Sequence, residues 1–406
     1  MDQCVALVRC ADYDLDAVTE AVRQAMDLLG GMAAFVQPGQ RVLLKPNIVR
    51  GVDPERAVST HPALVAAVAT LVIEAGGKPI IVESPGGPFS PIALRMAYRR
   101  TKIDWAAEVS GAELNFDCEG VQVSHPDGVV LHRLDLVRAL LDADVVINLP
   151  KLKTHNLTTL TLAVKNLLGL VPGALKIGYH AKLQDRERFC QGLVDILTYV
   201  KPALQIMDAV VGMEGNGPSG GDPRPIGAVV AGADALAVDI VCTALVGMAP
   251  EEVETTRVAM ARGLTSGRLQ DVELLGEPLD ALRVADFRRG MAASVDPGLV
   301  PRVLRGLLSA ESSANGEGDA LGRGPFRLLS TGWVWRQLVS FPYAGEDCTG
   351  CGFCARHCPV DAIQVVDRRA QMDTGRCIRC YCCHELCPET AVMLRKPLLG
   401  RVLTGR

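Results

Sequence analysis

The chain has 406 residues, which is more than one hydrophobic core of ordinary domain size holds, so two or three domains are expected. It has 42 lysines and arginines against 46 acidic residues, a formal net charge of −4, and no basic run long enough to mark a nucleic-acid surface. These totals favour a soluble globular protein and argue against DNA or RNA as a partner.

The N-terminal part is predicted to alternate strands with helices. Its first sixteen residues lack the basic head and apolar stretch of an export signal. The helix at 60–77 is expected to begin with Thr60 as its N-cap and to stop at two glycines. The elements predicted in this part are a strand at 41–49, this helix, a strand at 78–87, helical structure at 91–110, and a helix followed by a strand at 131–155.

The next part continues the same alternation. The elements predicted are helices at 158–171, 187–200 and 253–263, a strand at 203–221 that opens into a glycine loop, and a last strand at 282–290. The longest apolar region, 226–248, is interrupted by Asp234 and Asp239. Two carboxylates would be costly in lipid, so a buried strand and helix are expected there instead of a transmembrane segment. Residues 1–308 are therefore predicted to form a layered α/β domain with a largely parallel sheet.

A connecting segment is predicted at 309–342. Residues 309–325 are small, polar and rich in glycine, as in linkers. Residues 326–343 hold two of the three tryptophans and are interpreted as an apolar strap that packs the C-terminal module onto the core. A membrane-surface or partner-binding segment is the alternative. A small α+β module at 343–395 and a tail at 396–406 complete the predicted organisation.

Cysteines mark the C-terminal module. Nine of the 14 lie between residues 348 and 387, and eight of these repeat the spacing CxxCxxCxxxCP twice. This is the run of bacterial two-cluster ferredoxins, in which the fourth cysteine of each copy binds the cluster of the other copy. The spacing predicts two [4Fe–4S] clusters, one on Cys348, Cys351, Cys354 and Cys387, and one on Cys377, Cys380, Cys383 and Cys358.

Alternatives for the cysteines stay open at this stage. Zinc also binds four thiolates, but two matching copies that both end in Cys-Pro favour iron–sulfur clusters. Cys382 fits no position of the repeat and is interpreted as a packed free thiol, with an exchange of roles with Cys383 as the alternative. The other five cysteines are scattered, as small buried hydrophobic residues usually are, so a reducing cytoplasm is the expected compartment.

Polar side chains gather at the predicted strand ends of the large domain, where parallel sheets bind ligands. Buried lysine is costly without a partner, so several lysines there indicate a site for an anion such as a carboxylate or phosphate. For any single lysine, a solvated loop end is the alternative. The predicted binding residues are Lys45, Asn47, Lys151, Lys153, Lys165, Asn166 and Asn216.

Proton transfer is assigned to His155, because of the candidates His61, His155 and His180 it alone lies within the lysine cluster. Asp208 or Glu214 would assist it. Residues 215–220 read GNGPSG, which matches the formal glycine pattern of NAD sites, but the residues that follow cannot begin the required helix. A Rossmann NAD site is therefore not predicted, and a loop whose amides hold an anion is the alternative.

Several of these stretches resemble the DUF362 family, many members of which carry a C-terminal two-cluster ferredoxin module. The stretches are LLKPNIV, THPALVAAVATLVIEAGG, VVINLPKLKTH, AVKNLLG and MDAVVGMEGNGP. The resemblance covers about residues 3 to 290 and the cysteine-rich end, and it implies the architecture and the cluster ligands. The layout is also distantly similar to the N-terminal half of lactate racemases, although no motif here establishes their nickel cofactor.

These observations predict an iron–sulfur oxidoreductase. Electrons from an external low-potential donor would pass through the two clusters to an anionic small molecule, or to a second cofactor, in the large domain. Two hypotheses from other classes stay open. One is an electron-transfer or assembly subunit that serves a partner enzyme, and the other is a non-redox isomerase or lyase whose clusters sense redox state.

Overall fold

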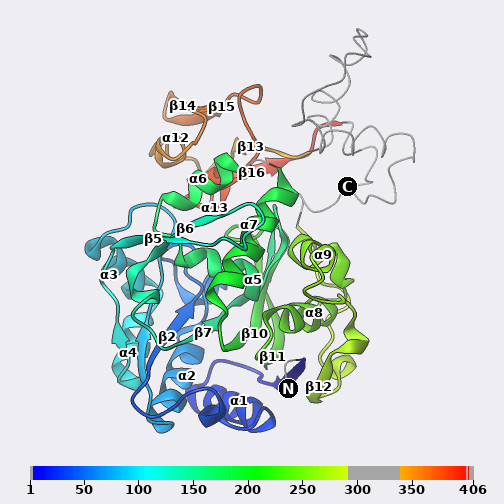
Figure 1. Cartoon of the computed structure of the whole chain (residues 1–406). Helices are drawn as coiled ribbons and strands as arrows, with labels where there is room; N and C mark the ends of the chain where they lie inside the picture. Colours follow the sequence, from blue (N-terminus) through cyan, green and yellow to red (C-terminus); the bar gives the residue numbers. More distant parts are fainter. Residues whose placement is uncertain (1–2, 184, 291–338, 399–400, 402–406) are drawn as a thin grey trace.

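The structure is a computed structural model that describes residues 3–183, 185–290, 339–398 and 401. Figure 1 shows a large lobe formed by the first 290 residues and a small lobe of C-terminal residues seated on one end of it. The predicted linker and the predicted strap up to residue 338 lie outside the described residues.

One mixed sheet runs through the large lobe. In the described part of the chain its main path is, in spatial order, β12 (Glu273–Gly276), β1 (Cys4–Arg9), β11 (Asp222–Gly232), β10 (Leu204–Glu214), β7 (Val145–Leu149), β2 (Arg41–Pro46), β3 (Lys78–Ile81) and β4 (Glu113–Leu114). The path from β10 to β4 is parallel, whereas β11 is antiparallel to both of its neighbours. The predicted largely parallel sheet is thus confirmed. Beyond the end of β7, β8 (Lys151–His155) pairs with β10, and β9 (Thr159–Thr161) pairs with β8.

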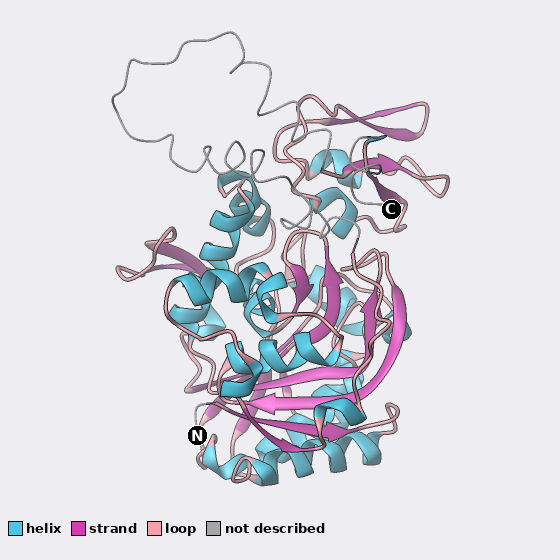
Figure 2. Ribbon diagram, turned by 90° about the vertical axis from the view of Figure 1, so that its right-hand side faces the viewer, coloured by secondary structure: helices cyan, strands magenta, loops and turns pink. Residues whose placement is uncertain are grey.

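Helices cover both faces of this sheet because its central strands are apolar on both sides (Figure 2). Leu43 and Val146 belong to one buried cluster, and their chain neighbours Leu44 and Ile147 belong to the other. The cluster with Leu44 is covered by α1 (Leu15–Leu28), α2 (Pro62–Glu74), α3 (Pro91–Arg100) and α4 (Ile103–Ser110). The cluster with Leu43 is covered by α5 (Ala163–Asn166), α7 (Arg186–Val200) and α9 (Glu254–Ala261). A third cluster packs α8 (Ala235–Leu245) onto β1, β10 and β11.

The helix predicted at the start of 131–155 is wrong. Residues Arg133–Val137 form β6, which pairs with β5 (Gly120–Ser124) in an antiparallel hairpin. Leu134 and Leu136 are buried while the residues between and before them are not, which is the two-residue period of a strand. A short run of leucines is compatible with the 3.6-residue period of a helix and with the two-residue period of a strand. Pairing with β5 decides for the strand.

The single helix predicted at 158–171 is also wrong. Its threonine-rich start forms β9, because β-branched side chains favour extended backbone, and only the one-turn helix α5 and a 3-10 turn (Leu167–Leu170) follow. The N-cap of α2 is His61 instead of Thr60, since Thr60 Oγ1 donates to Leu149 O at 2.6 Å. Residues 282–290 contain no strand, and β12 is the last strand of the large lobe in the described chain.

The small lobe has the predicted α+β composition. It contains two antiparallel pairs, β13 (Phe341–Ala344) with β16 (Val392–Arg395) and β14 (Ile363–Val366) with β15 (Arg369–Met372), and the one-turn helices α12 (Phe353–Arg356) and α13 (Cys382–Glu385). Strand β13 begins two residues before the predicted boundary at 343. Across both lobes, none of the described helices has the length and apolar character needed to span a membrane.

Candidate functional site

The eight repeated cysteines line two cavities in the small lobe, and all of them are free thiols. One cavity is bordered by Cys348, Cys351, Cys354 and Cys387, and the other by Cys358, Cys377, Cys380 and Cys383. In each cavity three cysteines come from one copy of the repeat and the fourth comes from the other copy. Four converging thiols are the ligand set that a [4Fe–4S] cluster requires.

The backbone of the two cysteine loops repeats as well. Gly350 and Gly352 in the first loop have φ of 70° and 72°, and the residues at the same positions of the second loop, Arg379 and Tyr381, have φ of 58° and 61°. Residues other than glycine adopt this left-handed conformation only rarely. The turn is therefore held by its surroundings, and it aims the Arg379 N–H at the sulfur of Cys377 at 3.4 Å.

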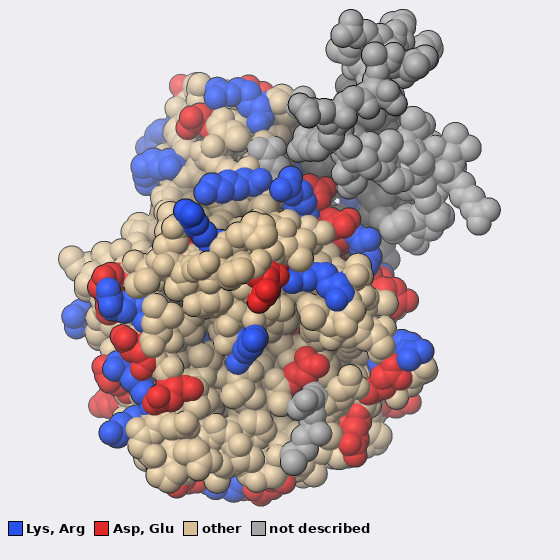
Figure 3. Space-filling model, viewed as in Figure 1, with Lys and Arg blue, Asp and Glu red and all other residues tan. Residues whose placement is uncertain are grey.

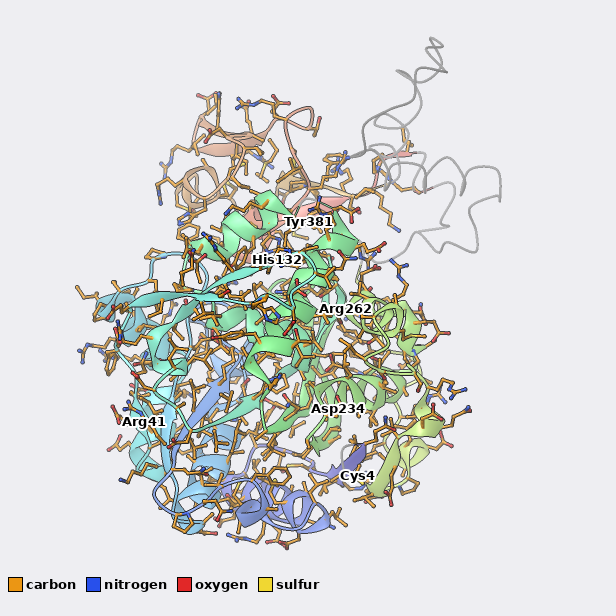
Figure 4. The ribbon with its side chains drawn as sticks, viewed as in Figure 1. Cys4, Arg41, His132, Asp234, Arg262 and Tyr381 are labelled. Atoms are coloured by element: carbon orange, nitrogen blue, oxygen red, sulfur yellow. The ribbon has the colours of Figure 1, made fainter. Side chains whose placement is uncertain are left out.

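The second cysteine loop contacts the large lobe through hydrogen bonds. Arg50 donates to Pro388 O at 2.7 Å, and Ser219 donates to Glu385 O at 2.9 Å. Tyr381, labelled in Figure 4, lies at this junction, where α13 follows it. In Figure 3, Lys and Arg side chains are prominent where the two lobes meet on the viewed face. The carboxyl ends of the central strands thus lie under α13.

A pocket lies between these strand ends and α13. Its floor and walls come from loops after β2 and β3, from β8 and β9, from α5 and from α6 (Leu175–Lys182). Its polar lining from the large lobe is Asn47, Glu83, Ser84, Lys153, His155, Thr161, Lys165, Asn166, Lys176 and His180. The small lobe closes it with Cys382, Glu385 and Leu386. The pocket is therefore shared between the two lobes.

The pocket gathers part of the predicted site. The predicted residues that line it are Asn47, Lys153, His155, Lys165 and Asn166. The predicted residues that do not line it are Lys45, Lys151, Asp208, Glu214 and Asn216. Cys382 lines this pocket and neither of the two cysteine cavities, and its Sγ lies 4.0 Å from Cys380 O.

Lys45 lies below the pocket in a saturated ion pair. Its Nζ is 2.7 Å from Glu83 Oε2 and also donates to Pro46 O at 2.8 Å and Asn166 Oδ1 at 3.3 Å. A Cβ on Gly169 would lie 2.4 Å from this Nζ, so the pair needs glycine at that position. With three acceptors, Lys45 has no donor left for a ligand.

Lys151 and Asp208 form a second buried pair away from the pocket. Lys151 Nζ lies 2.8 Å from Asp208 Oδ2 and donates to the hydroxyl of Tyr13 at 2.7 Å. The Tyr13 ring stacks on His61 at 3.6 Å, and burial lowers the pKa of His61 to about 4. These groups satisfy one another, which is the arrangement of a structural network.

Glu214 is the last residue of β10, and Asn216 lies in the glycine loop that follows. Glu214 Oε1 accepts from Arg288 Nε at 2.8 Å. The backbone oxygen of Asn216 lies 3.3 Å from Nε2 of His384 in the small lobe. These two residues thus tie the loop to its neighbours.

His155 has a defined tautomer. Its Nδ1 accepts from the N–H groups of Leu157 at 3.0 Å and Thr158 at 3.2 Å, so the neutral ring carries its proton on Nε2. This Nε2 lies 3.1 Å from Glu385 Oε1. Burial lowers the pKa of His155, and although burial alone would raise the pKa of Glu385, the nearby His155 and Lys165 hold it below its usual range. A contact across the two lobes thus places one carboxylate in the pocket.

Three lysines line the same pocket as this carboxylate. Lys153 Nζ donates to Asn47 Oδ1 at 2.7 Å and has no carboxylate among its hydrogen-bond partners in the described chain. Lys176 Nζ donates to Ser84 Oγ at 3.0 Å, and burial lowers its pKa to about 7. Burial also lowers the pKa of Lys165. The lining is therefore rich in basic side chains, with Glu385 as its one carboxylate outside the Lys45 pair in the described residues.

Two further lining groups lack partners. Thr161 Oγ1 and His180 Nδ1 are buried without a hydrogen bond in the described part of the chain. Buried polar atoms are nearly always paired, so these two atoms indicate a polar ligand or ordered water in the pocket.

Sequence reasoning missed Lys176, Thr161 and Glu385. Lys176 and His180 stand four residues apart and share one face of α6, and that spacing was the signal available for them. Glu385 lies inside the cysteine repeat, and nothing in its neighbourhood pointed to the other lobe.

Comparisons with known proteins agree with this division of the chain. Residues 42–244 match a family model described as "Domain of unknown function (DUF362)", and residues 345–364 match one described as "4Fe-4S binding domain". A thylakoid-associated protein of Synechocystis is 38% identical over 308 residues, which is 75% of this chain and 93% of the relative. The second model covers the first copy of the cysteine repeat, so clustered thiols and family match together support iron–sulfur binding by the small lobe.

Two other proteins are similar over less of the chain. One component of an ion-translocating oxidoreductase complex from Methanosarcina acetivorans is 40% identical over 48 residues, 12% of this chain and 18% of that component. Among solved structures, the lactate racemase apoprotein of Thermoanaerobacterium thermosaccharolyticum is 13% identical, with a TM-score of 0.36 over 59% of this chain and 56% of that chain.

Proposed function

The chain belongs to the DUF362 family, with an iron–sulfur module attached, and we propose that it is an oxidoreductase that delivers electrons to an anionic small molecule or second cofactor in the shared pocket. Two [4Fe–4S] clusters in the small lobe would supply these electrons one at a time. An external low-potential carrier would be the donor. We propose the cytoplasm as its compartment, because fourteen unpaired cysteines suit reducing surroundings.

The observation that carries the proposal is the position of α13. Cys383 borders a cysteine cavity and its chain neighbour Cys382 borders the pocket. Neighbouring Cα atoms are about 3.8 Å apart, so one residue spans the wall between the cavity and the pocket. Likewise, Leu386 borders the pocket, and its chain neighbour Cys387 borders the other cysteine cavity. A ligand in the pocket would therefore lie close to both cysteine sets.

The charge of the lining supports an anion as the ligand. Lys153, Lys165 and Lys176 line the pocket together with Glu385, so outside the Lys45–Glu83 pair its described lining has more basic than acidic side chains. Buried charge without a counter-charge is costly, and an anion would offset it. Lys45 and Lys151, which are already paired, would hold the scaffold.

Two clusters are proposed because both halves of the module have the same build. The second loop repeats the thiol spacing and the left-handed backbone positions of the first loop. A Cys387→Ser variant tests the crossed ligands, since it should alter the signal of the cluster on Cys348, Cys351 and Cys354. A signal change confined to the other cluster would contradict the crossing.

The experiment for the whole proposal uses the full chain purified without oxygen. Iron and sulfide are counted, the protein is reduced with dithionite, and EPR spectra are recorded with and without a panel of small carboxylates and phosphate. We expect one compound to change the spectrum, and a Lys153→Met variant to bind it about tenfold more weakly, the equivalent of one charge-assisted hydrogen bond.

The matched control is Lys182→Met, because Lys182 is exposed at the end of α6. It should bind as the unaltered chain does. Zinc in place of iron, or spectra that no anion changes, would contradict the proposal. Co-purification with a second protein and no anion binding would favour the hypothesis of a subunit that serves a partner enzyme, and turnover of a substrate without any reductant would favour the isomerase or lyase.

A further inference from the structure

One of the lysines in or near the pocket differs from the others in its surroundings. Lys45 and Lys151 are paired with carboxylates, and Lys153 and Lys176 donate to amide, hydroxyl or carbonyl oxygens. Lys165 Nζ has no hydrogen-bond acceptor within the described residues, and its neighbour is the face of Phe189, 5.9 Å from the ring centroid. Its amine therefore lines the pocket without a hydrogen-bond acceptor in the described chain, while the Glu385 carboxylate acts on it only through space.

The chain holds this amine in place by its backbone. Helix α5 has a single turn, and the buried carboxylate of Asp239 accepts from the N–H of Ala163 at 2.7 Å. Asn166, the next residue after Lys165, donates to Asn148 Oδ1 at 2.8 Å and accepts from Asn47 Nδ2 at 2.8 Å. The helix is thus fixed on both sides of Lys165, as positioning of a reacting group requires.

The chemistry of such an amine is nucleophilic. Burial lowers the pKa of Lys165, which increases the share of neutral amine. A desolvated lysine near other cations is the arrangement by which proteins prepare lysine to attack a carbonyl carbon. Lys153 and Lys176 line the same pocket.

Two unpaired groups lie beside it. The ring of His180 stacks on the same Phe189 at 4.3 Å, and its Nδ1 is buried without a partner in the described chain. Thr161, four residues before Lys165, also has an unpaired buried hydroxyl there. Both atoms are suited to exchange a hydrogen bond or a proton with a hydroxyl group that forms on a ligand.

We propose that Lys165 forms a Schiff base with the carbonyl group of a small 2-oxo acid bound in the pocket. This inference rests on the proposed function and names the class of its anionic ligand. The carboxylate of the acid would lie against Lys153 and Lys176. Lys165 Nζ attacks the carbonyl carbon, a C–N bond forms, and a proton moves from nitrogen to the oxygen. Loss of that oxygen as water leaves the C=N bond, and no electrons are exchanged in these steps.

The test uses pyruvate as the probe and sodium borohydride to trap the imine. Full-length protein purified without oxygen is incubated with pyruvate, reduced, digested and analysed by mass spectrometry. We expect one reduced pyruvate attached to Lys165, at least tenfold above the level on the exposed Lys182. Lys165→Arg keeps the charge and cannot form the imine, so it should lose the adduct and keep its iron content. Lys182→Arg should retain it.

The outcomes separate the two proposals. An adduct that is absent from the unaltered chain, or that persists at another pocket lysine in Lys165→Arg, would overturn the Schiff base. If the adduct fails while pyruvate still changes the EPR spectrum, the proposed electron transfer stands without a covalent step. If the adduct forms while no anion accepts electrons, the covalent site stands and the redox proposal fails.

Discussion

At the scale of single residues, partners decide what each buried lysine does. Lys45 and Lys151 are as deeply buried as Lys153, but each has a carboxylate within 2.8 Å and so belongs to the scaffold. Among the described residues, Lys176 donates hydrogen bonds only to the two oxygens of Ser84. A buried lysine without a paired carboxylate loses its proton at a lower pH than a free lysine does. The pKa of Lys176 therefore lies near physiological pH.

Anion binding is expected to depend on pH through Lys176. Burial lowers its pKa to about 7, so its charge is present below that pH and is lost above it. We expect the affinity for a bound 2-oxo acid, whose own charge is constant here, to fall about tenfold between pH 6 and pH 8, the equivalent of one charge-assisted hydrogen bond. Lys176→Met should bind weakly and without this slope. Titration calorimetry measures both, and an equal slope in Lys176→Met would refute the assignment.

At the scale of elements, the one-turn helix α5 carries Lys165 and Asn166, yet it is too short to be stable by itself. The side-chain carboxyl group of Asp239, from α8, accepts from the N–H groups of Ala163 and Val164 and replaces a local cap. Burial raises the pKa of Asp239 to about 8. The site therefore depends on a contact between α5 and α8. The residues that form its two hydrogen bonds are 76 and 75 positions apart in the sequence.

Removal of this cap should destabilise the large lobe. Asp239→Ala leaves two buried N–H groups without an acceptor, so we expect the free energy of unfolding to fall by about 2–4 kcal/mol. Asp239→Asn keeps an oxygen acceptor and should lose less. Urea unfolding followed by fluorescence measures both, and equal losses would show that the hydrogen bonds are not the cause.

The same carboxyl group gives a pH dependence with a defined sign. Its folded-state pKa of about 8 lies above the ordinary value of 3.8, so the folded state takes up a proton that the unfolded state does not. That contribution is complete below pH 3.8 and is lost as the pH rises through 8. The unaltered chain should therefore lose stability between pH 6 and pH 8 relative to Asp239→Asn.

At the scale of the whole molecule, the proposed electron transfer depends on how the small lobe packs on the large lobe. The small lobe sits on one end of the large lobe (Figure 1). Arg50, Ser219 and His155 contact the second cysteine loop, and Glu385 and Leu386 from that loop complete the lining of the pocket. A lobe that tilts away would open the pocket and remove its carboxylate. The packing of the small lobe thus brings the cysteine cavities next to the proposed ligand pocket.

Weakening the contact between the two lobes should reduce the effect of a pocket ligand on the clusters without loss of the clusters. Arg50→Ala removes the 2.7 Å hydrogen bond to Pro388 O, a charged contact expected to contribute about 1.5–3 kcal/mol. We expect normal iron content, faster hydrogen exchange in residues 377–390 and a smaller effect of the ligand on the EPR spectrum. Arg23→Ala, which breaks a surface pair with Glu74, is the control. Unchanged exchange in Arg50→Ala would show that this contact does not hold the lobe.

The sequence alone determined the features that depend on local geometry. The α/β alternation follows from apolar periods within single elements, and the grouping of three thiols at one cavity follows from the spacing of three residues within one short loop. The crossing of the fourth cysteine is predicted from the two-cluster ferredoxin pattern. Errors came where a short stretch suited two periods, as at Leu134 and Leu136, or where threonines before Lys165 favoured a strand.

The tertiary structure decided which polar residues meet. Lys45 and Lys165 look alike in the sequence, but Glu83 lies 2.7 Å from the first and no acceptor reaches the second within the described chain. Glu385 joins His155 across 230 positions of the chain, although it stands between two cysteines of the repeat. The physical reason is that burial and ion pairing depend on distances through space, and residues remote in sequence set those distances only once the two lobes have packed.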